Sequence, residues 1–265
     1  MERRNYKPLK ECLSDLKNLK TLWDLIAIVN LQYNDWKTKF WRQIKADVLI
    51  DQNKVFATQI KQVNKEVRFI KGWQTLGEKV ANMTIVLNLV ESLRGDYMED
   101  RHWKQLKDKT NTEFDHKAST FCLDDILRLK LYKLKPEVEE IVDIAQKEFK
   151  IDKKLKIIES NWAKQMFFFD NYKENYIFAA LDDMMEILDA NSLDLMGMKA
   201  QGKYVEYFID TVEDWRDKLG RVDVVVNEWL KVQKNWRILV NIFVGSEDIR
   251  QQLPEDTKVF ETVHG

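Results

Sequence analysis

The sequence predicts a mainly α fold: an elongated multi-helix bundle with one small β-hairpin. Apolar residues recur at three-, four- and seven-residue steps through most of the chain, which is the spacing of one helix face. The 265 residues include only 8 Gly and 3 Pro, which favours long helices with short connections. The 9 Trp are typical of helix–helix packing, because an indole ring fills the gap between crossing helices.

The N-terminal part predicts three helices in succession. The first begins after Pro8 and runs, with room for a bend, to about Ile50. Its apolar face consists of Leu9, Leu13, Leu16, Leu19, Trp23, Ile26, Tyr33 and Trp36. A second helix covers about 55–70 and ends at Gly72, since glycine commonly terminates helices. A third covers about 73–90.

The middle of the chain predicts two short helices and one long one. The first short helix includes 101–103, the polar stretch 110–116 is typical of a loop, and a second short apolar helix covers about 121–129. A long helix opens at Pro136 and reaches Trp162. Proline needs no N–H donor in a first helical turn, and the acidic residues after it complement the helix dipole.

The helical periodicity is interrupted once in the C-terminal half. Aromatic runs on either side of a polar turn predict a β-hairpin near 166–178. Helices resume near Leu181 and again over 204–219. Gly220 is expected to break the chain before a further helix over 222–243.

These helices are expected to form two bundles. Residues 1–110 make an N-terminal helical bundle, and residues 111–265 make a second one that includes the hairpin. No repeat of fixed period is present, so an array of helical repeats is not predicted.

The sequence contains no recognisable catalytic constellation. It has no P-loop pattern G-x-x-x-x-G-K-[S/T], and the nearest segment, Gly77 to Lys79, lacks the loop and hydroxyl that would hold phosphate and magnesium. His102, His116 and His264 are scattered, with no nucleophile or acid partner beside them, which favours packing or solvated roles. The chain itself is therefore not expected to be an enzyme.

Charge and composition exclude several classes of partner. Lys+Arg 43 nearly balance Asp+Glu 44, whereas binding to nucleic acid or to an anionic membrane normally needs a basic excess. No run approaches the ~18 apolar residues of a membrane span, and the N-terminus lacks the apolar core of a secretion signal. Cys12 and Cys122 show no metal-ligand spacing and suit a reducing, intracellular compartment.

Charged residues are nevertheless clustered at several places. The acidic pairs at 124–125, 139–140 and 182–183 lie near predicted helix starts, where the helix dipole accounts for them without a metal. No cofactor is predicted. An acidic stretch at 181–198 and a basic one at 101–135 are either ordinary solvated faces or complementary docking surfaces.

The last long helix is expected to end at a junction with special backbone needs. Gly245 would release the helix through a left-handed backbone, which glycine adopts cheaply. Ser246 is a candidate N-cap for a short following helix, Glu247 and Asp248 favour its positive end, and Pro254 would end it. This arrangement is either an ordinary kinked helix–turn–helix or a hinge where rigid helices change their angle.

Several segments match the motifs of one known protein family, in the same order along the chain. The strongest is the run from Trp229 to Asp256, which is similar to W-x-x-V-Q-x-x-W followed by I-F-x-G-S-E-D-I-R-x-Q-L-P-E-D. Earlier matches are Leu-Trp-Asp at 22–24, Trp36, Trp41, Arg-His-Trp at 101–103 and the helix that ends at Trp162. Together they resemble the N-terminal part of a dynein heavy chain linker, of the axonemal, outer-arm beta-like type.

The resemblance implies a mechanical element of an axonemal dynein motor. Such an arm bends and straightens over the AAA+ ring of the same heavy chain and transmits the power stroke. Its partners would be that ring and other dynein chains, in the axoneme of a cilium or flagellum. Trp229, Trp236 and Phe243 would pack the helix that ends at Gly245. The ATPase would belong to the parent motor, of which the chain would be a piece, truncated before the rest of the linker.

Two other classes of function stay open at this point. A passive helical scaffold or tail-interaction module, without a power stroke, would have the same composition. An enzyme with an unrecognised site would need a cleft in which at least two titratable groups converge.

Overall fold

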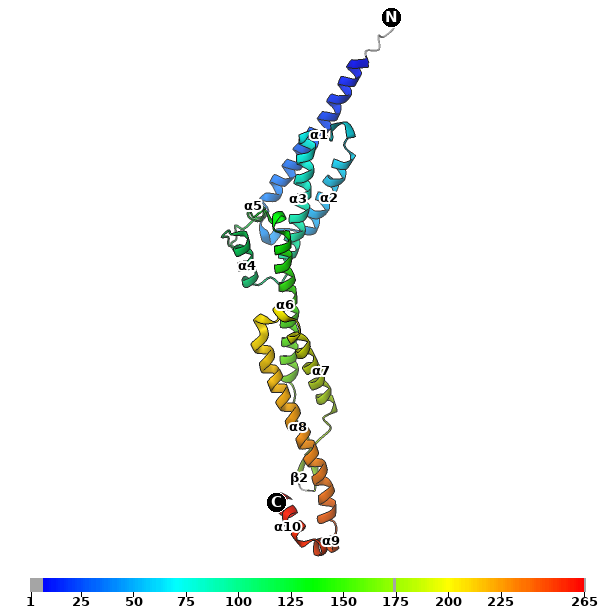
Figure 1. Cartoon of the computed structure of the whole chain (residues 1–265), viewed down its shortest axis with the longest axis vertical. Coiled ribbons are helices and arrows are strands. Elements are labelled where there is room, and N and C mark those ends of the chain that lie inside the picture. Colours follow the sequence, from blue (N-terminus) through cyan, green and yellow to red (C-terminus); the bar gives the residue numbers. More distant parts are fainter. Residues whose placement is uncertain (1–6, 174, 265) are drawn as a thin grey trace. The chain divides into compact units, whose positions relative to one another are not determined.

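Helices make up most of the structure, a computed structural model that describes residues 7–173 and 175–264 (Figure 1). Its helices and its one hairpin among those residues confirm the predicted fold class. The chain forms two compact units, Met1–Lys147 and Glu148–Gly265, which divide within helix α6 (Lys135–Trp162). The two-bundle division expected after residue 110 stays a prediction.

The first unit is built around three long helices that lie side by side (Figure 1). Its elements before α6 are α1 (Lys7–Lys37), α2 (Ala46–Gln62), α3 (Lys71–Leu93), α4 (Asp100–Thr110), α5 (Leu123–Arg128) and short 3-10 turns at Trp41–Gln43, Lys65–Val67 and Leu131–Lys133. The buried face of α1 begins at Leu22 and continues through Val29 to Trp36.

A buried polar network fixes the alignment of these three helices. The Tyr33 hydroxyl donates to the side-chain oxygen of Asn53. The Asn53 amide nitrogen in turn donates to the Val80 carbonyl (3.2 Å) and the Thr84 hydroxyl (2.7 Å). Because Asn53 is only 1% exposed, a shift of one helix would leave buried polar groups without partners.

The helix expected to run from Pro8 to about Ile50 is interrupted at 38–45, so the prediction of one helix, even a bent one, is wrong there. α1 ends before a turn at Trp41, and α2 begins after it. The main-chain N–H of Trp41 donates to the main-chain carbonyl of Phe121 (2.8 Å). Its ring packs against the rings of Trp103 and Phe121, at centroid distances of 5.8 and 5.6 Å. These partners are distant in sequence, so the periodicity of the segment alone does not reveal the turn.

The helix expected over 55–70 begins and ends earlier than predicted. Gly72 does not end it but lies in the first turn of α3. The Arg68 guanidinium donates to the carbonyls of Lys61 (2.6 Å) and Val63 (3.1 Å). This side chain satisfies carbonyls at the end of α2 that would otherwise lack partners, in place of a glycine terminus.

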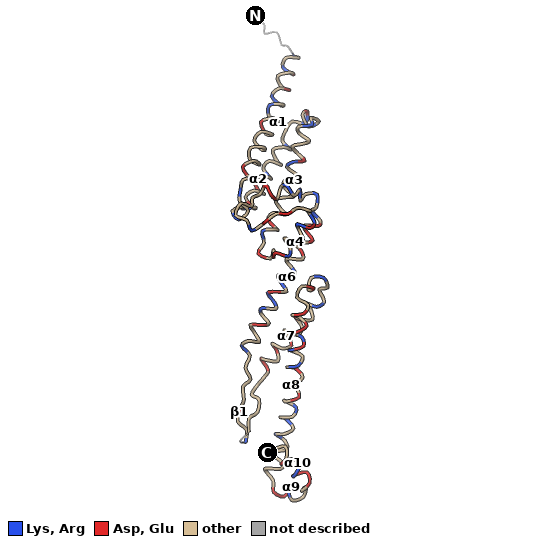
Figure 2. Tube along the Cα trace, turned by 90° about the vertical axis from the view of Figure 1, so that its left-hand side faces the viewer, with Lys and Arg blue, Asp and Glu red and all other residues tan. Residues whose placement is uncertain are grey.

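The second unit consists of the end of α6, the hairpin and four further helices among its described residues. Its elements are β1 (Phe169–Tyr172), β2 (Asn175–Phe178), α7 (Asp182–Lys199), α8 (Ile209–Phe243), α9 (Glu247–Gln252), α10 (Pro254–His264) and 3-10 turns at Gly202–Tyr204 and Glu206–Phe208. The end of α6, α7 and the first part of α8 share an apolar core. Figure 2 shows acidic and basic residues interspersed along α6 and α8, and Asp194 of the acidic α7 pairs with Lys154 of α6.

Helix α8 runs without interruption through Gly220, so the break expected there is wrong. A glycine inside a helix costs about 1 kcal/mol relative to alanine. Leu219 and Val226, on either side of it, are each 2% exposed. Full burial of one such side chain is worth about 1.5–3 kcal/mol, so packing outweighs the local preference.

Candidate functional site: the junction of the hairpin, α8 and α10

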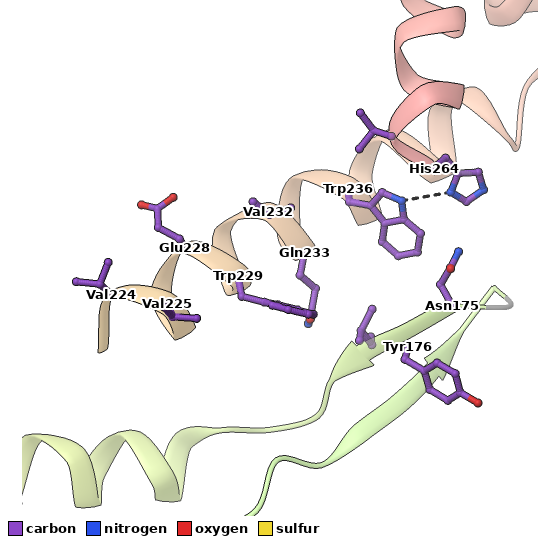
Figure 3. Close-up of a pocket in the computed structure, with 12 residues that line it drawn as sticks. Asn175, Tyr176, Val224, Val225, Glu228, Trp229, Val232, Gln233, Trp236 and His264 are labelled. Atoms are coloured by element: carbon purple, nitrogen blue, oxygen red, sulfur yellow. Dashed lines mark hydrogen bonds between the residues drawn. The ribbon is translucent and has the colours of Figure 1, made fainter. Parts of the chain in front are cut away.

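One face of α8 meets the β-hairpin through three side chains. Trp229, Gln233 and Trp236 follow at steps of four and three residues, which places them on the same side of the helix. The Trp229 ring packs on Phe178 of β2 at 4.9 Å, and the Trp236 ring meets Tyr172 of β1 edge-on at 5.8 Å. Figure 3 shows Trp229, Gln233 and Trp236 along α8 beside the hairpin.

Gln233 satisfies the main-chain groups of Phe178 at the outer edge of β2. Its side-chain oxygen accepts from the Phe178 N–H (2.7 Å), and its side-chain nitrogen donates to the Phe178 carbonyl (3.2 Å). Phe178 lies opposite Phe169, and the Ala179 N–H donates to the Phe168 carbonyl (2.9 Å). In an antiparallel pair these positions alternate, so the main-chain groups of Phe178 face away from β1. Gln233 thus takes the place of a third strand at this position.

The tip of the hairpin is fastened to the last turns of α8 through Asn241. The side-chain oxygen of Asn241 accepts from the Tyr172 hydroxyl (3.2 Å) and from the Lys173 ammonium group (2.6 Å). The Arg237 guanidinium lies 4.9 Å from the centroid of the Tyr172 ring. The hairpin therefore contacts α8 from Trp229 nearly to the end of the helix.

Gly245 lies just beyond the end of α8, as predicted, but for a different physical reason. Its backbone is not left-handed: among the glycines described, Gly202 is the one with positive φ (60°). A Cβ added to Gly245 would instead overlap the main-chain carbonyl oxygen of Asn241. Glycine is needed here because the chain passes close to the preceding helical turn.

The residues after Gly245 start a short helix without the expected side-chain cap. Ser246 has the extended backbone of an N-cap (φ −132°, ψ 114°), but its hydroxyl makes no capping hydrogen bond, so that part of the prediction is wrong. Glu247 and Asp248 occupy the first turn of α9, where carboxylates complement the helix dipole. Pro254 follows α9 and opens α10, a position that needs no N–H donor.

Helix α10 packs back on the end of α8 through aromatic rings. Phe243, 8% exposed, stacks on Phe260 at 5.2 Å, and Phe260 stacks on His264 at 5.1 Å. The Trp236 indole N–H donates to the His264 side chain (3.3 Å), drawn as a dashed line in Figure 3. Trp236 thus contacts both the hairpin and α10, and Phe243, two turns further along the same face of α8, contacts α10 as well.

An open groove runs along α8 beside these contacts. Its first part, about 640 Å³, lies between α8, β2 and the end of α10, and is the pocket in Figure 3. Its second part, about 440 Å³, continues between α8 and α10. Val232, Trp236 and Val263 line both parts. We refer to the two parts together as the α8–α10 groove.

The histidines have hydrogen-bonding and packing partners rather than a common site. His102 is fully buried and accepts the Glu99 N–H (3.0 Å) in the first turn of α4. His116 stacks on Trp103 at 4.6 Å and lies 3.4 Å from Asp100. Burial lowers the pKa of His116, and a hydrogen bond from Lys117 lowers the pKa of Asp100. This cluster ties the loop after α4 back to its first turn.

Two kinds of site are not found among the described residues. No three His, Cys, Asp or Glu side chains lie close enough together to hold a metal ion in the ranges 7–173 and 175–264. In the same ranges, no helix combines the length and apolar character needed to cross a membrane.

Sequence reasoning missed Gln233 and Asn241. Gln233 had one usable indication, its position between Trp229 and Trp236 on the same helix face, where a polar residue is unexpected. Asn241 had none, because its importance comes from the hairpin tip, which lies about 70 residues earlier in the chain.

Comparison with known proteins gives a consistent relationship. A family model described as "Dynein heavy chain, N-terminal region 2" matches residues 9–265. Over 98% of its length the chain is 40% identical to the dynein beta chain of the flagellar outer arm from Chlamydomonas reinhardtii and 36% identical to dynein axonemal heavy chain 17 from Mus musculus. It is also 35% identical to dynein axonemal heavy chain 9 from Homo sapiens. The chain spans 6% of the length of each of these relatives.

Proposed function

Because the chain belongs to the dynein heavy chain family and corresponds to its N-terminal region 2, we propose that it is a mechanical linker segment of an axonemal motor. In this proposal it bends and straightens over the AAA+ ring of the same heavy chain and transmits the power stroke. ATP hydrolysis belongs to the ring. The other dynein chains of the complex are further partners, and the motor works in the axoneme of a cilium or flagellum.

The observation that supports this proposal best is the contrast between α8 and the segment that follows it. α8 has 35 residues and is therefore about 50 Å long at 1.5 Å per residue. The hairpin contacts its C-terminal part through Trp229, Gln233 and Asn241, which opposes bending there. The helix then ends at Phe243, just before Gly245, and α9 contributes no buried residue.

A helix that is held by contacts along its side and then ends abruptly is expected to bend least within itself and most at the junction that follows. Bending within α8 would break the contacts with the hairpin, whereas a change at Gly245 and Ser246 alters few of them. A change in the angle between α8 and α10 would then have to break or shift the stacked pair Phe243 and Phe260. We therefore propose Gly245–Ser246 as the hinge.

The test is made in a complete motor that carries Gly245→Ala. We expect slower microtubule gliding with ATP turnover largely retained, because the arm is changed and the chemistry is not. Gly220→Ala is the matched control: it lies inside α8, nothing surrounds its added Cβ within 4 Å, and it should glide at the wild-type rate. Gliding velocity and ATP turnover are measured on the same preparation.

The alternative is a passive helical scaffold or tail-interaction module, for which the exposed apolar groove beside α8 is the relevant observation. A scaffold transmits no bending. Wild-type gliding by the Gly245→Ala motor, despite a measured loss of stability, would favour this alternative over the linker.

A further inference from the structure

We propose that the α8–α10 groove binds an amphipathic α-helix of a partner, whose apolar stripe is flanked by Lys or Arg side chains. This inference concerns a surface of the second unit and does not depend on the hinge at Gly245. Three properties of the groove lead to it: the apolar residues that line it, its length, and the sign of its charges.

The groove is lined by apolar side chains that water reaches. Val232, Val259 and Val263 are 61%, 67% and 72% exposed, and they come from two different helices. A single exposed valine on a surface is ordinary, but a contiguous exposed apolar surface commonly marks a binding site. Trp229 and Trp236 add aromatic surface, the type most enriched at protein interfaces.

The length of the groove suits a helix. It follows α8 from Val224 to Phe243, and 20 residues of helix span about 30 Å. A partner helix of about five turns could therefore lie along it, with its apolar side chains fitting between those of α8 and α10. An added strand would lose its pairing at Phe178, because Gln233 already satisfies the main-chain groups of that residue.

The charged residues of the groove favour a partner that carries positive charge. Glu228 lines its first part and Asp256 its second, and no Lys or Arg among the described residues lines either part. Lys231 approaches Glu228 only to 3.6 Å, with both side chains about two-thirds exposed. Such surface pairs are weak and are readily replaced by a better-placed cation. A basic flank on the partner would face both carboxylates.

The experiment compares two designed helical peptides of about 20 residues with the same leucine stripe. One has lysines beside the stripe and the other has glutamates. Binding of each labelled peptide to the 265-residue chain is followed by fluorescence anisotropy. We expect saturable binding of the lysine peptide, roughly tenfold or more tighter than that of the glutamate peptide at low salt. This difference should narrow as salt rises and screens the charges.

Variants of the chain locate the binding. Val232→Lys should abolish binding of the lysine peptide. Ile238→Lys is the matched control: it is on the same helix, similarly exposed (53%), and outside the groove. In the double variant Glu228→Gln, Asp256→Asn, both peptides should still bind through their leucine stripes. The lysine peptide should no longer bind more tightly than the glutamate peptide.

Three results would overturn the proposal: equal affinity for both peptides, no binding of either, or equal loss in the Val232→Lys and Ile238→Lys variants. Sedimentation velocity of the chain alone addresses a second copy as the occupant. A dimer that forms with concentration and is lost in Val232→Lys would assign the groove to self-association, and the basic helix would then be rejected.

Discussion

The side-chain amide of Gln233 makes two hydrogen bonds to one residue, accepting from the main-chain N–H of Phe178 and donating to its carbonyl. A two-stranded hairpin is marginal by itself in water. Here one amide from α8 satisfies the outward-facing main-chain groups of Phe178 on β2, and the Trp229 ring packs against the Phe178 ring. Helix and hairpin therefore stabilise each other.

Gln233→Met should destabilise the second unit. Methionine has a similar length but leaves the Phe178 N–H and carbonyl without partners, which costs about 1–3 kcal/mol for a buried group. Chemical denaturation followed by circular dichroism gives the free energy of unfolding. Gln59→Met, at an exposed position of α2, is the control and should change it by less than about 0.5 kcal/mol. Equal small effects of both changes would contradict the role assigned to Gln233.

Gly245→Ala and Gly220→Ala should act in opposite directions. An added Cβ at Gly245 overlaps the Asn241 carbonyl oxygen, so the backbone must shift, at a cost above about 1 kcal/mol. At Gly220 the added Cβ meets nothing within 4 Å, and alanine should stabilise the helix by about 0.5–1 kcal/mol. Thermal unfolding of both variants measures the sign, and stabilisation by Gly245→Ala would show that no close approach exists.

Ser246→Ala should be nearly silent. A serine that caps a helix through its hydroxyl contributes about 0.5–2 kcal/mol, but the Ser246 hydroxyl makes no such bond. We expect a change below about 0.5 kcal/mol in the free energy of unfolding. A larger loss in the same denaturation experiment would mean that the hydroxyl caps α9 in solution.

Tyr33→Phe should destabilise the first unit by about 1–3 kcal/mol, because it leaves the buried oxygen of Asn53 without its donor. Tyr176→Phe, at a position 73% exposed, is the control and should be neutral. Burial also raises the pKa of Tyr33. The stability that depends on its neutral hydroxyl is therefore lost as pH rises above the value of about 10 for an unfolded tyrosine. Tyr33→Phe should lose less stability than the wild type above that pH.

The loop after α4 should weaken as pH falls. Burial lowers the pKa of His116, so the unfolded chain takes up a proton at a higher pH than the folded one. Stability is then lost as pH falls below about 6.5, the ordinary value for histidine. Asp100 and Asp115 face His116 and oppose this effect, whereas Lys117 and Lys107 reinforce it.

An NMR titration of the His116 ring should give a midpoint below that of an exposed histidine. His116→Phe keeps a ring against Trp103 but removes the group that titrates. The melting temperature of this variant should therefore depend less on pH between about 5 and 7, the range around the ordinary histidine pKa of about 6.5. Asp100→Asn should move the His116 midpoint further down, because it removes the nearest negative charge. An upward movement in Asp100→Asn would contradict this arrangement.

The sequence by itself determined the type of most elements and the family. Helix periodicity, the opening of α6 at Pro136 and the aromatic runs of the hairpin are local features, and local chemistry is sufficient to predict them. The family pattern around Trp229 and Phe243 is also a property of the sequence alone. The carboxylates of α9 follow from the helix dipole, which any helix start has.

Only the tertiary structure decided where helices end and which side chains hold the junction together. Trp41 leaves the helix because Trp103 and Phe121 bury it, and Gly220 stays in a helix because its neighbours are buried. The roles of Gln233 and Asn241 depend on contacts between residues about 55 to 70 positions apart. Such contacts form when elements pack, and packing energies exceed the local preferences that a sequence pattern records.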